Sequence, residues 1–131
     1  MCPLRILLAD DNDEILGAIR QELAQELEII GTVSNGQDAV DAVLLFDPDV
    51  VVLDIAMPIL NAIQASSRIH ECNVRRTILI LTIQENNEYV SAAFAAGVSG
   101  YVTKRRLLTD LGYAIRQVAE GHMFLSPSFS K

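Results

Sequence analysis

The sequence contains few of the residues that usually bind transition metals or form disulfides: its 131 residues include two cysteines and two histidines. Cys2 and Cys72 are far apart and form no CxxC pair, so we expect two free thiols, as in a reducing cytoplasm. His70 and His122 have no HxxxH or HExxH partner, and we expect both to be structural or surface residues. A metal site built on histidine or cysteine is therefore not indicated.

Long apolar runs and an excess of positive charge are also missing. No apolar run reaches membrane-spanning length, and the opening MCPLRILLADD lacks a signal-peptide layout because acidic residues stand where a cleavage region should be. Ten basic residues against 17 acidic ones give a formal net charge of -7, which argues against binding of a nucleic-acid backbone by this segment itself. With 50% apolar residues at a common single-domain length, we expect one folded cytoplasmic domain that makes no membrane contact.

Several nucleotide-binding and cation-binding motifs are absent. There is no GxGxxG and no GxxxxGK(S/T), so nucleotide binding by a glycine-rich loop is unsupported. An EF-hand loop counted from Asp10 needs Gly at its sixth position and Glu at its twelfth, where this chain has Ile15 and Gln21. The DND of Asp11–Asp13 resembles the aspartate-nucleophile phosphatases only faintly, because those enzymes need further motifs and usually a cap, for which this chain has little room.

Short runs rich in β-forming residues alternate with segments of helical periodicity. The predicted strands are Arg5–Ala9, Glu28–Val33, Val50–Leu53, Thr77–Leu81 and Gly100–Val102. The apolar residues that predict the helices are Ile15, Leu16, Ile19, Leu23 and Leu27; Ala39, Val40, Val43 and Leu44; Ala62, Ala65 and Ile69; Val90, Ala93 and Phe94; and Leu108, Leu111, Ile115 and Val118. Asp13 is the expected N-cap of the first helix, and Gly97 and Gly121 are expected to end the last two.

A strand-helix unit repeated five times predicts an α/β fold, with a doubly wound parallel sheet covered by helices on both faces. The continuous apolar runs VVVL and TILIL are typical of strands buried on both sides. We expect one domain over residues 1–121. Residues 122–131 are expected to form a C-terminal tail or the start of a linker, because their last part is small, polar and interrupted by proline.

Polar residues follow four of the predicted strands. In chain order they are Asp10 with Asp11, Asp54, Thr82, and Thr103 with Lys104. In an open α/β sheet, ligands bind outside the carboxyl ends of the strands, so these side chains are expected at one edge. Three clustered carboxylates could hold a hard cation such as Mg²⁺, which would relieve their mutual repulsion. Asp54 could then act as a nucleophile toward phosphorus, while Lys104 and Thr82 bind the phosphoryl oxygens.

Each of these residues taken alone has a simpler explanation. An aspartate after a strand is more often a turn former than a catalyst. A single lysine such as Lys104 is usually a solvated charge, and Thr82 is a common strand residue. The joint placement at four strand ends is what favours a functional site.

From Leu4 to about Glu120 the chain resembles the receiver domain of a two-component response regulator. The residues that carry the resemblance are Asp10, Asp11, Asp54 within VVVLDIAMP, Thr82, Tyr101 and Lys104. The segments DIAMPILNAIQA, AAGVSGYVTK and AIRQVAEGHMFLSP are similar to the branch typified by NarL, FixJ and LuxR. The resemblance implies a flavodoxin-like fold with five strands in the order 2-1-3-4-5.

The resemblance also implies a phosphoryl-transfer site. Asp54 would take a phosphoryl group from a phosphohistidine on a partner histidine kinase, or from a small donor such as acetyl phosphate. Asp11 and Asp54, with the backbone carbonyl of Ala56, would ligate Mg²⁺, and Asp10 would assist through water. Lys104 would pair with the phosphoryl group. Such a protein catalyses its own phosphorylation and dephosphorylation and is not a turnover enzyme.

A switch and an output are implied as well. Thr82 would move toward the phosphoryl group, and Tyr101 would turn inward into the space vacated. A changed surface around the fourth and fifth helices, or a homodimer through the first and fifth, would carry the signal. In this branch a linker leads to a helix-turn-helix domain that binds DNA. This chain contains no such domain, so we expect either a receiver separated from its output or a stand-alone one.

Two residues depart from the family's pattern. Ile83 stands after the switch threonine, where a small residue is usual, and its bulk could narrow access to Asp54. Ala62 stands where glycine is usual, and alanine would be strained there if the backbone needs positive φ. These departures leave open an atypical receiver that dimerises or binds partners without phosphate. A small Mg²⁺ phosphatase is a third possibility.

Overall fold

The computed structural model describes residues 4–10, 12–23, 27–54, 62–72, 77–82, 92–104 and 107–125. The strands are β1 (Leu4–Ala9), β2 (Leu27–Val33), β3 (Val50–Asp54), β4 (Thr77–Thr82), β5 (Gly100–Thr103) and β6 (Phe124–Leu125). The helices are α1 (Asp13–Leu23), α2 (Gly36–Phe46), α3 (Ala62–Cys72) and α5 (Leu107–Ala119), and residues 92–95 are also helical. None of the helices in these ranges is long and apolar enough to cross a membrane.

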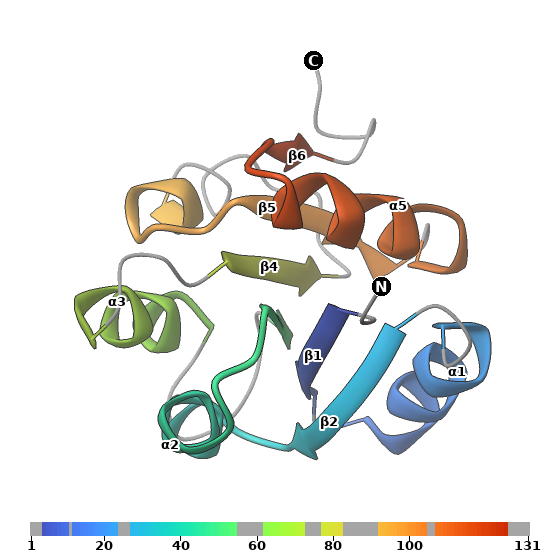
Figure 1. Cartoon of the computed structure of the whole chain (residues 1–131), viewed down its shortest axis with the longest axis horizontal. Helices are drawn as coiled ribbons and strands as arrows, with labels where there is room; N and C mark the ends of the chain where they lie inside the picture. Colours follow the sequence, from blue (N-terminus) through green and yellow to red (C-terminus); the bar gives the residue numbers. More distant parts are fainter. Residues whose placement is uncertain are drawn as a thin grey trace.

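The strands form one sheet in the order β2-β1-β3-β4-β5-β6, and all neighbouring strands are parallel (Figure 1). The predicted α/β class and the order of the five predicted strands are confirmed. The sheet also contains β6, which the sequence pattern did not predict: Phe124 and Leu125 pair with Gly100 and Tyr101 of β5. Two residues beyond the predicted domain boundary at 121 thus belong to the sheet, and residues 126–131 lie outside the described ranges.

Helices cover both faces of the sheet, with α1 and α5 on one side and α2 and α3 on the other (Figure 1). The core under α1 and α5 includes the strand residues Ile6, Leu8, Val50, Val52, Leu79, Leu81 and Val102. The core under α2 and α3 includes Leu7, Ala9, Val51, Leu53, Ile78, Ile80 and Tyr101. Neighbouring residues of one strand enter different cores, as the two-residue period of a strand dictates. This double burial explains the continuous apolar runs of β3 and β4.

In the edge strand β2, the side chains exchange faces of the sheet partway along the strand. Its register with β1 skips Ile30, which is left as an extra residue in the strand. Such a bulge reverses the alternation of side chains. Accordingly, Ile29 packs against the core under α1, whereas Val33 packs against the core under α2. A bulged edge strand is also a poorer template for pairing with another chain.

The first helix differs from the prediction at both ends. The side-chain oxygen of Asn12 accepts the backbone N–H groups of Glu14 at 2.9 Å and Ile15 at 3.3 Å. Asn12 is therefore the N-cap, and Asp13, predicted as the cap, is the first helical residue. Leu27, predicted in the helical stripe, is a buried residue at the start of β2. Leu27 is apolar because the strand buries it in the core under α1 and α5, and its spacing from the apolar residues of α1 happens to match the helical period.

Candidate functional site

Asp10 and Asp54 lie at the carboxyl edge of the two strands where the order of the sheet reverses. β1 and β3 are neighbours with Ala9 opposite Leu53, so the residues that follow these two lie at the same edge. Asp10 follows β1, and Asp54 is the last residue of β3. This is the position at which open α/β sheets bind ligands. Both aspartates are buried, so their charges need compensation from elsewhere.

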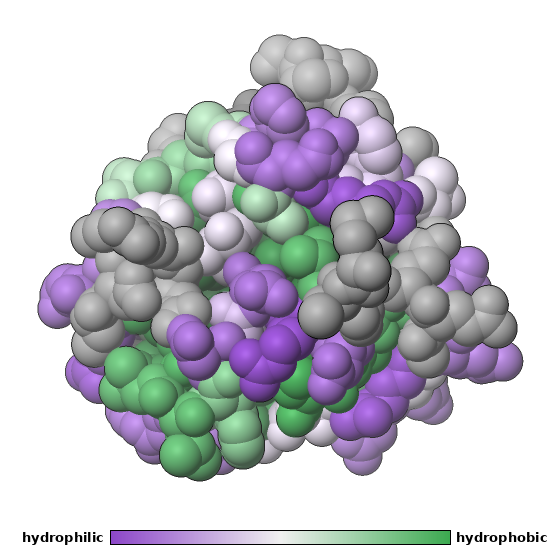
Figure 2. Space-filling model, in the orientation of Figure 1, coloured by the Kyte–Doolittle hydropathy of each residue, from purple (hydrophilic) through white to green (hydrophobic). Residues whose placement is uncertain are grey.

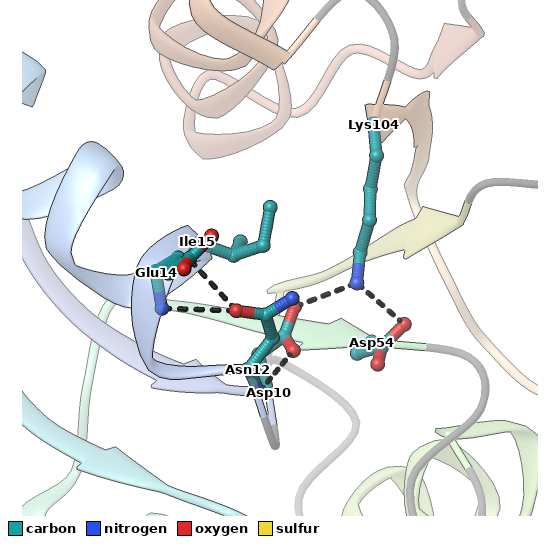
Figure 3. Close-up of polar contacts among 6 residues, drawn as sticks. All are labelled: Asp10, Asn12, Glu14, Ile15, Asp54 and Lys104. Carbon is teal, nitrogen blue, oxygen red and sulfur yellow. Dashed lines mark hydrogen bonds and ion pairs between the residues drawn. The ribbon is translucent and has the colours of Figure 1, made fainter.

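Lys104, which follows β5, supplies that compensation. Its Nζ atom lies 2.9 Å from Oδ2 of Asp10 and 3.3 Å from Oδ1 of Asp54 (Figure 3). The contact with Asp10 is the shorter of the two. The other oxygen of Asp10, Oδ1, accepts the backbone N–H of Asn12 at 2.9 Å. Three predicted site residues from three separate strands are thus brought together.

The electrostatics of this cluster keep Lys104 charged. Burial of the ammonium opposes its charge, but the close contact with Asp10 and the negative charges of Asp54 and Asp10 outweigh desolvation and raise the pKa of Lys104 above its ordinary value. Counted formally, two carboxylates and one ammonium carry one excess negative charge. The cluster therefore attracts a further cation.

The donor set at this edge fits Mg²⁺. This ion prefers oxygen ligands and commonly binds one or two carboxylates together with water and phosphate oxygens. Asp10 and Asp54 supply carboxylate oxygens that converge on one ammonium. The described ranges contain no group of three or more acidic, histidine or cysteine side chains that could hold a metal. The other predicted ligands, Asp11 and the backbone carbonyl of Ala56, lie outside the described residues.

Thr82 and Thr103 form a cross-strand pair beside this cluster. They end β4 and β5, and the register places them opposite each other. Both are buried. The sequence had suggested a role for Thr82 and none for Thr103, although Thr103 directly precedes Lys104. Its place beside Thr82 follows from the register of the two strands, which the sequence alone does not give.

Tyr101 is fully buried in the core under α2 and α3. The resemblance implied that this ring turns inward once Asp54 carries a phosphoryl group. The structure places the ring in this inward position.

The two departures from the family's pattern have different outcomes. Ala62 is the first residue of α3. A helical backbone has negative φ, so alanine is compatible with that position and the expected strain does not arise. Ile83 lies outside the described residues, and its predicted effect on access to Asp54 stays a prediction.

Fold and site together define a class: a doubly wound parallel α/β domain with a buried pair of aspartates and a lysine at its topological switch point. The family model of the response regulator receiver domain matches residues 6–116 of the chain. The chain therefore belongs to the response regulator receiver domain family.

The relatives of the chain include response regulators and regulators of transcription. The chain is 34% identical over 126 residues to the transcriptional regulatory protein DesR of Bacillus subtilis (strain 168), covering 95% of this chain and 62% of DesR. It is 29% identical over 130 residues to the nitrate/nitrite response regulator protein NarL of Escherichia coli (strain K12), covering 98% of this chain and 60% of NarL. The chain thus spans about three fifths of the length of these relatives.

A solved structure shares the fold over nearly the whole chain. The LuxR-family two-component response regulator from Aurantimonas sp. SI85-9A1 superposes with a TM-score of 0.94 at 27% identity, covering 98% of this chain and 94% of that one.

Proposed function

We propose that this chain is a phosphorylation-activated receiver. Asp54 accepts a phosphoryl group from a histidine kinase or a small phosphodonor in the presence of Mg²⁺, and the modified domain switches an output that regulates transcription. The observation that carries the proposal is the Lys104 ammonium, 2.9 Å from Asp10 and 3.3 Å from Asp54 at the switch point of the sheet. A nucleophilic carboxylate, a second carboxylate and a cation are the groups that phosphoryl transfer needs in one place.

The reaction assigns a task to each residue. A carboxylate oxygen of Asp54 attacks phosphorus, forming a new P–O bond while the P–N bond to the donor imidazole, or the P–O bond to acetate, breaks and the leaving group takes the electron pair. Lys104 is already in contact with Asp54 and pairs with the phosphoryl oxygens. Asp11 and Asp54 would hold Mg²⁺ with the Ala56 carbonyl, Asp10 would assist through water, and the ion would supply charge neutralisation. The chain modifies itself and is not a turnover enzyme.

The energy that such a modification supplies is sufficient for a switch. A phosphoryl group adds a charge of about -1.5 to -2 and three acceptor oxygens. Moving a population from 1:99 to 99:1 takes about 5.5 kcal/mol of differential stabilisation. Charge-assisted hydrogen bonds contribute roughly 1.5–3 kcal/mol each, so contacts from Lys104 and Thr82 together approach that value.

The relatives support the output and the partners. DesR is a transcriptional regulatory protein, and one matched structure, at 25% identity, is of two RcsB dimers bound to two parallel DNAs. Since this chain covers 67% of that RcsB chain, DNA binding is proposed for a separate helix-turn-helix domain. A sensor histidine kinase, a homodimer and a cytoplasmic location complete the proposal.

The proposal is tested by incubating the wild-type protein and Asp54→Asn with acetyl phosphate and reading the intact mass. We expect one hydroxylamine-labile phosphoryl adduct on the wild type, dependent on Mg²⁺ and abolished by a chelator, and none on the variant. Steady turnover of p-nitrophenyl phosphate would instead indicate the phosphatase. No adduct from acetyl phosphate or from a panel of histidine kinases would contradict phosphorylation.

A second candidate is a receiver that acts as an interaction module without phosphate. The feature that favours it is the bulk of Ile83, which follows Thr82 where a small residue is usual. This candidate predicts that Asp54→Asn leaves partner binding or dimerisation unchanged. The phosphorylation-dependent receiver predicts a loss of the response in the same variant.

A further inference from the structure

The carboxyl-terminal turn of α2 carries a group of exposed apolar side chains. Leu44 is 62% exposed, Leu45 76% and Phe46 43%, and we call these three residues the α2 patch. Figure 2 shows a continuous apolar area over α2, next to hydrophilic side chains. Single exposed apolar residues are ordinary on a protein surface, whereas a contiguous group with a polar rim marks a binding surface. Nothing in phosphoryl transfer at Asp54 requires this feature.

The α2 patch lies on a helix that is capped by hydrogen bonds at both ends. At the start, the side chain of Asn35 accepts the backbone N–H of Asp38 at 2.8 Å. At the end, Asp47 is left-handed (φ 55°), and its N–H donates to the carbonyl of Val43 at 3.0 Å. Such capping satisfies backbone groups that would otherwise let the last turn fray.

Arg5 of β1 adds a second restraint at the end of the helix. Its guanidinium donates to the backbone carbonyls of Phe46 and Asp47, both at 2.9 Å. The backbone N–H of Arg5 in turn donates to Oδ2 of Asp49 at 2.8 Å. The patch is therefore a preorganised surface, and a partner would not have to order it on binding.

The rim of the α2 patch is acidic on both sides. Asp38 and Asp41 precede it on the same outward face of the helix, because residues three and four apart are neighbours there. Asp47 and Asp49 follow it, and all four acidic residues are exposed. The described contacts place two basic residues at this helix: the Arg5 guanidinium donates to main-chain carbonyls at its end, and the Arg68 guanidinium donates to Oε1 of Gln37 near its start. The four exposed acidic residues outnumber them. The surface combines an apolar centre with negative flanks.

We propose that the α2 patch docks a protein partner through a cationic amphipathic helix, with leucine-like side chains on the patch and Lys or Arg facing its acidic rim. Charge complementarity selects this occupant. A second copy of the chain would bring acidic rims together, with a formal net charge of -7 on each copy. An anionic lipid surface would be repelled by the same rim. The proposal does not depend on phosphorylation of Asp54.

The position of the patch supports this independence. α2 ends at Phe46 and β3 begins at Val50, so the patch lies near the amino ends of the strands. Asp54 lies at the opposite, carboxyl edge of the sheet. A partner on the patch would leave the phosphoryl-transfer site accessible.

A fluorescein-labelled synthetic helix of leucine and lysine, titrated with the unmodified protein and followed by anisotropy, tests the proposal. We expect binding that weakens as salt rises, and at least tenfold weaker binding by Leu44→Ser/Leu45→Ser. Met123→Ser, which changes an exposed apolar residue elsewhere, should bind as the wild type does. Asp38→Asn/Asp41→Asn should weaken binding and flatten its salt dependence, whereas Glu22→Gln/Glu120→Gln, which removes two exposed acids elsewhere, should not.

Each other outcome overturns the assignment. Failure of the wild type to bind, or equal weakening in the patch variants and their controls, would show that the patch is not the docking surface. A concentration-dependent dimer in sedimentation that Leu44→Ser/Leu45→Ser abolishes would assign the patch to a second copy instead. Circular dichroism of each variant establishes that it is folded, which is expected because the changed side chains are exposed.

Discussion

At the scale of single residues, the two buried aspartates are not equivalent. Asp10 is nearer to Lys104 than Asp54 is, and its second oxygen accepts the N–H of Asn12. Asp54 has the longer contact with the ammonium and, when ionised, adds to the excess negative charge. The fold therefore depends more on Asp10, although Asp54 is the proposed nucleophile.

This asymmetry predicts different costs for two matched substitutions. In chelator at pH 7, Asp10→Asn should lower the free energy of unfolding by roughly 1.5–3 kcal/mol, the range for hydrogen bonds that involve a charged group. Either substitution removes the same repulsion between the two carboxylates, so the difference comes from their contacts. Asp54→Asn should cost less, about 1 kcal/mol, because it loses only the longer contact with Lys104 and leaves the hydrogen bond from Asn12 to Asp10 in place. Urea unfolding measures both values. An equal or larger cost for Asp54→Asn would contradict the described geometry.

Lys104 also gives the stability a specific dependence on pH. A folded pKa above the unfolded value means that the ammonium's contribution is fully present below the unfolded pKa, about 10.4, and is lost as pH rises through the folded value. In chelator, the stability difference between wild type and Lys104→Met should be constant from neutral pH up to the unfolded pKa, about 10.4, and should narrow above it. Urea titrations across this range measure it. A difference that disappears below pH 9 would contradict the raised pKa.

The clustering of Asp10, Asp54 and Lys104 was predictable, because each lies at the carboxyl end of an apolar strand and the carboxyl ends of parallel strands meet at one edge of the sheet. The same reasoning could not give the inward ring of Tyr101, since rotamers depend on packing against residues distant in sequence. Asp13 was taken for the cap because Asn12 and Asp13 are adjacent and both are good capping residues. The hydrogen bonds of the folded loop decide between them.

At the scale of elements, the start of α1 provides a direct comparison of those two residues. Asn12→Ala removes the acceptor for two helix N–H groups and should cost about 1 kcal/mol, within the roughly 0.5–2 range for caps. Asp13→Ala removes only a favourable charge at the helix N-terminus, worth about 0.3–1 kcal/mol. Thermal or urea unfolding of the pair gives the order. A larger loss for Asp13→Ala would restore Asp13 as the cap.

Two glycines that end helical segments separate backbone strain from steric conflict. Gly97 and Gly121 have φ values of 98° and 92°. A Cβ at Gly97 would lie 2.7 Å from Nδ1 of His70 on α3, whereas a Cβ at Gly121 would meet nothing within 4 Å. Gly121→Ala should therefore cost about 1–2 kcal/mol, the strain of a left-handed residue. Gly97→Ala should cost about 1–3 kcal/mol more, from overpacking.

A double substitution identifies the source of that extra cost. His70→Ala in the Gly97→Ala background should recover part of this cost, because it removes the imidazole that the new Cβ would clash with. A double-mutant cycle should show this coupling between the two positions. Equal costs for Gly97→Ala and Gly121→Ala would mean that α3 and the 92–97 segment do not pack as described.

Elements with a strong pattern were predictable and short or irregular ones were not. The central strands were found because burial on both faces demands continuous apolar runs. β6 has two residues, too few to show any period, and its pairing depends on the sheet edge that β5 provides. The bulge at Ile30 was hidden because Ile29 and Ile30 are both apolar and Gly31 has no side chain, so the sequence does not show where the strand changes faces.

At the scale of the whole molecule, the sheet separates two surfaces. The phosphoryl-transfer site lies at the carboxyl edge, and the α2 patch lies near the amino ends of the strands. The parallel α/β class was predictable from the alternation of strands and helices, whereas the strand order came from the resemblance to receiver domains. The exposure of Leu44 was not, because the residue fits the apolar stripe of α2 and only the packed structure places it outside the core.

The most direct test of the central claim is to locate the phosphoryl group. After incubation with Mg²⁺ and acetyl phosphate, borohydride reduction converts an aspartyl phosphate to homoserine, and peptide mass spectrometry then identifies the residue. The account predicts homoserine at Asp54 alone. Homoserine at Asp10 or Asp11, or a phosphoryl group on any other side chain, would contradict it.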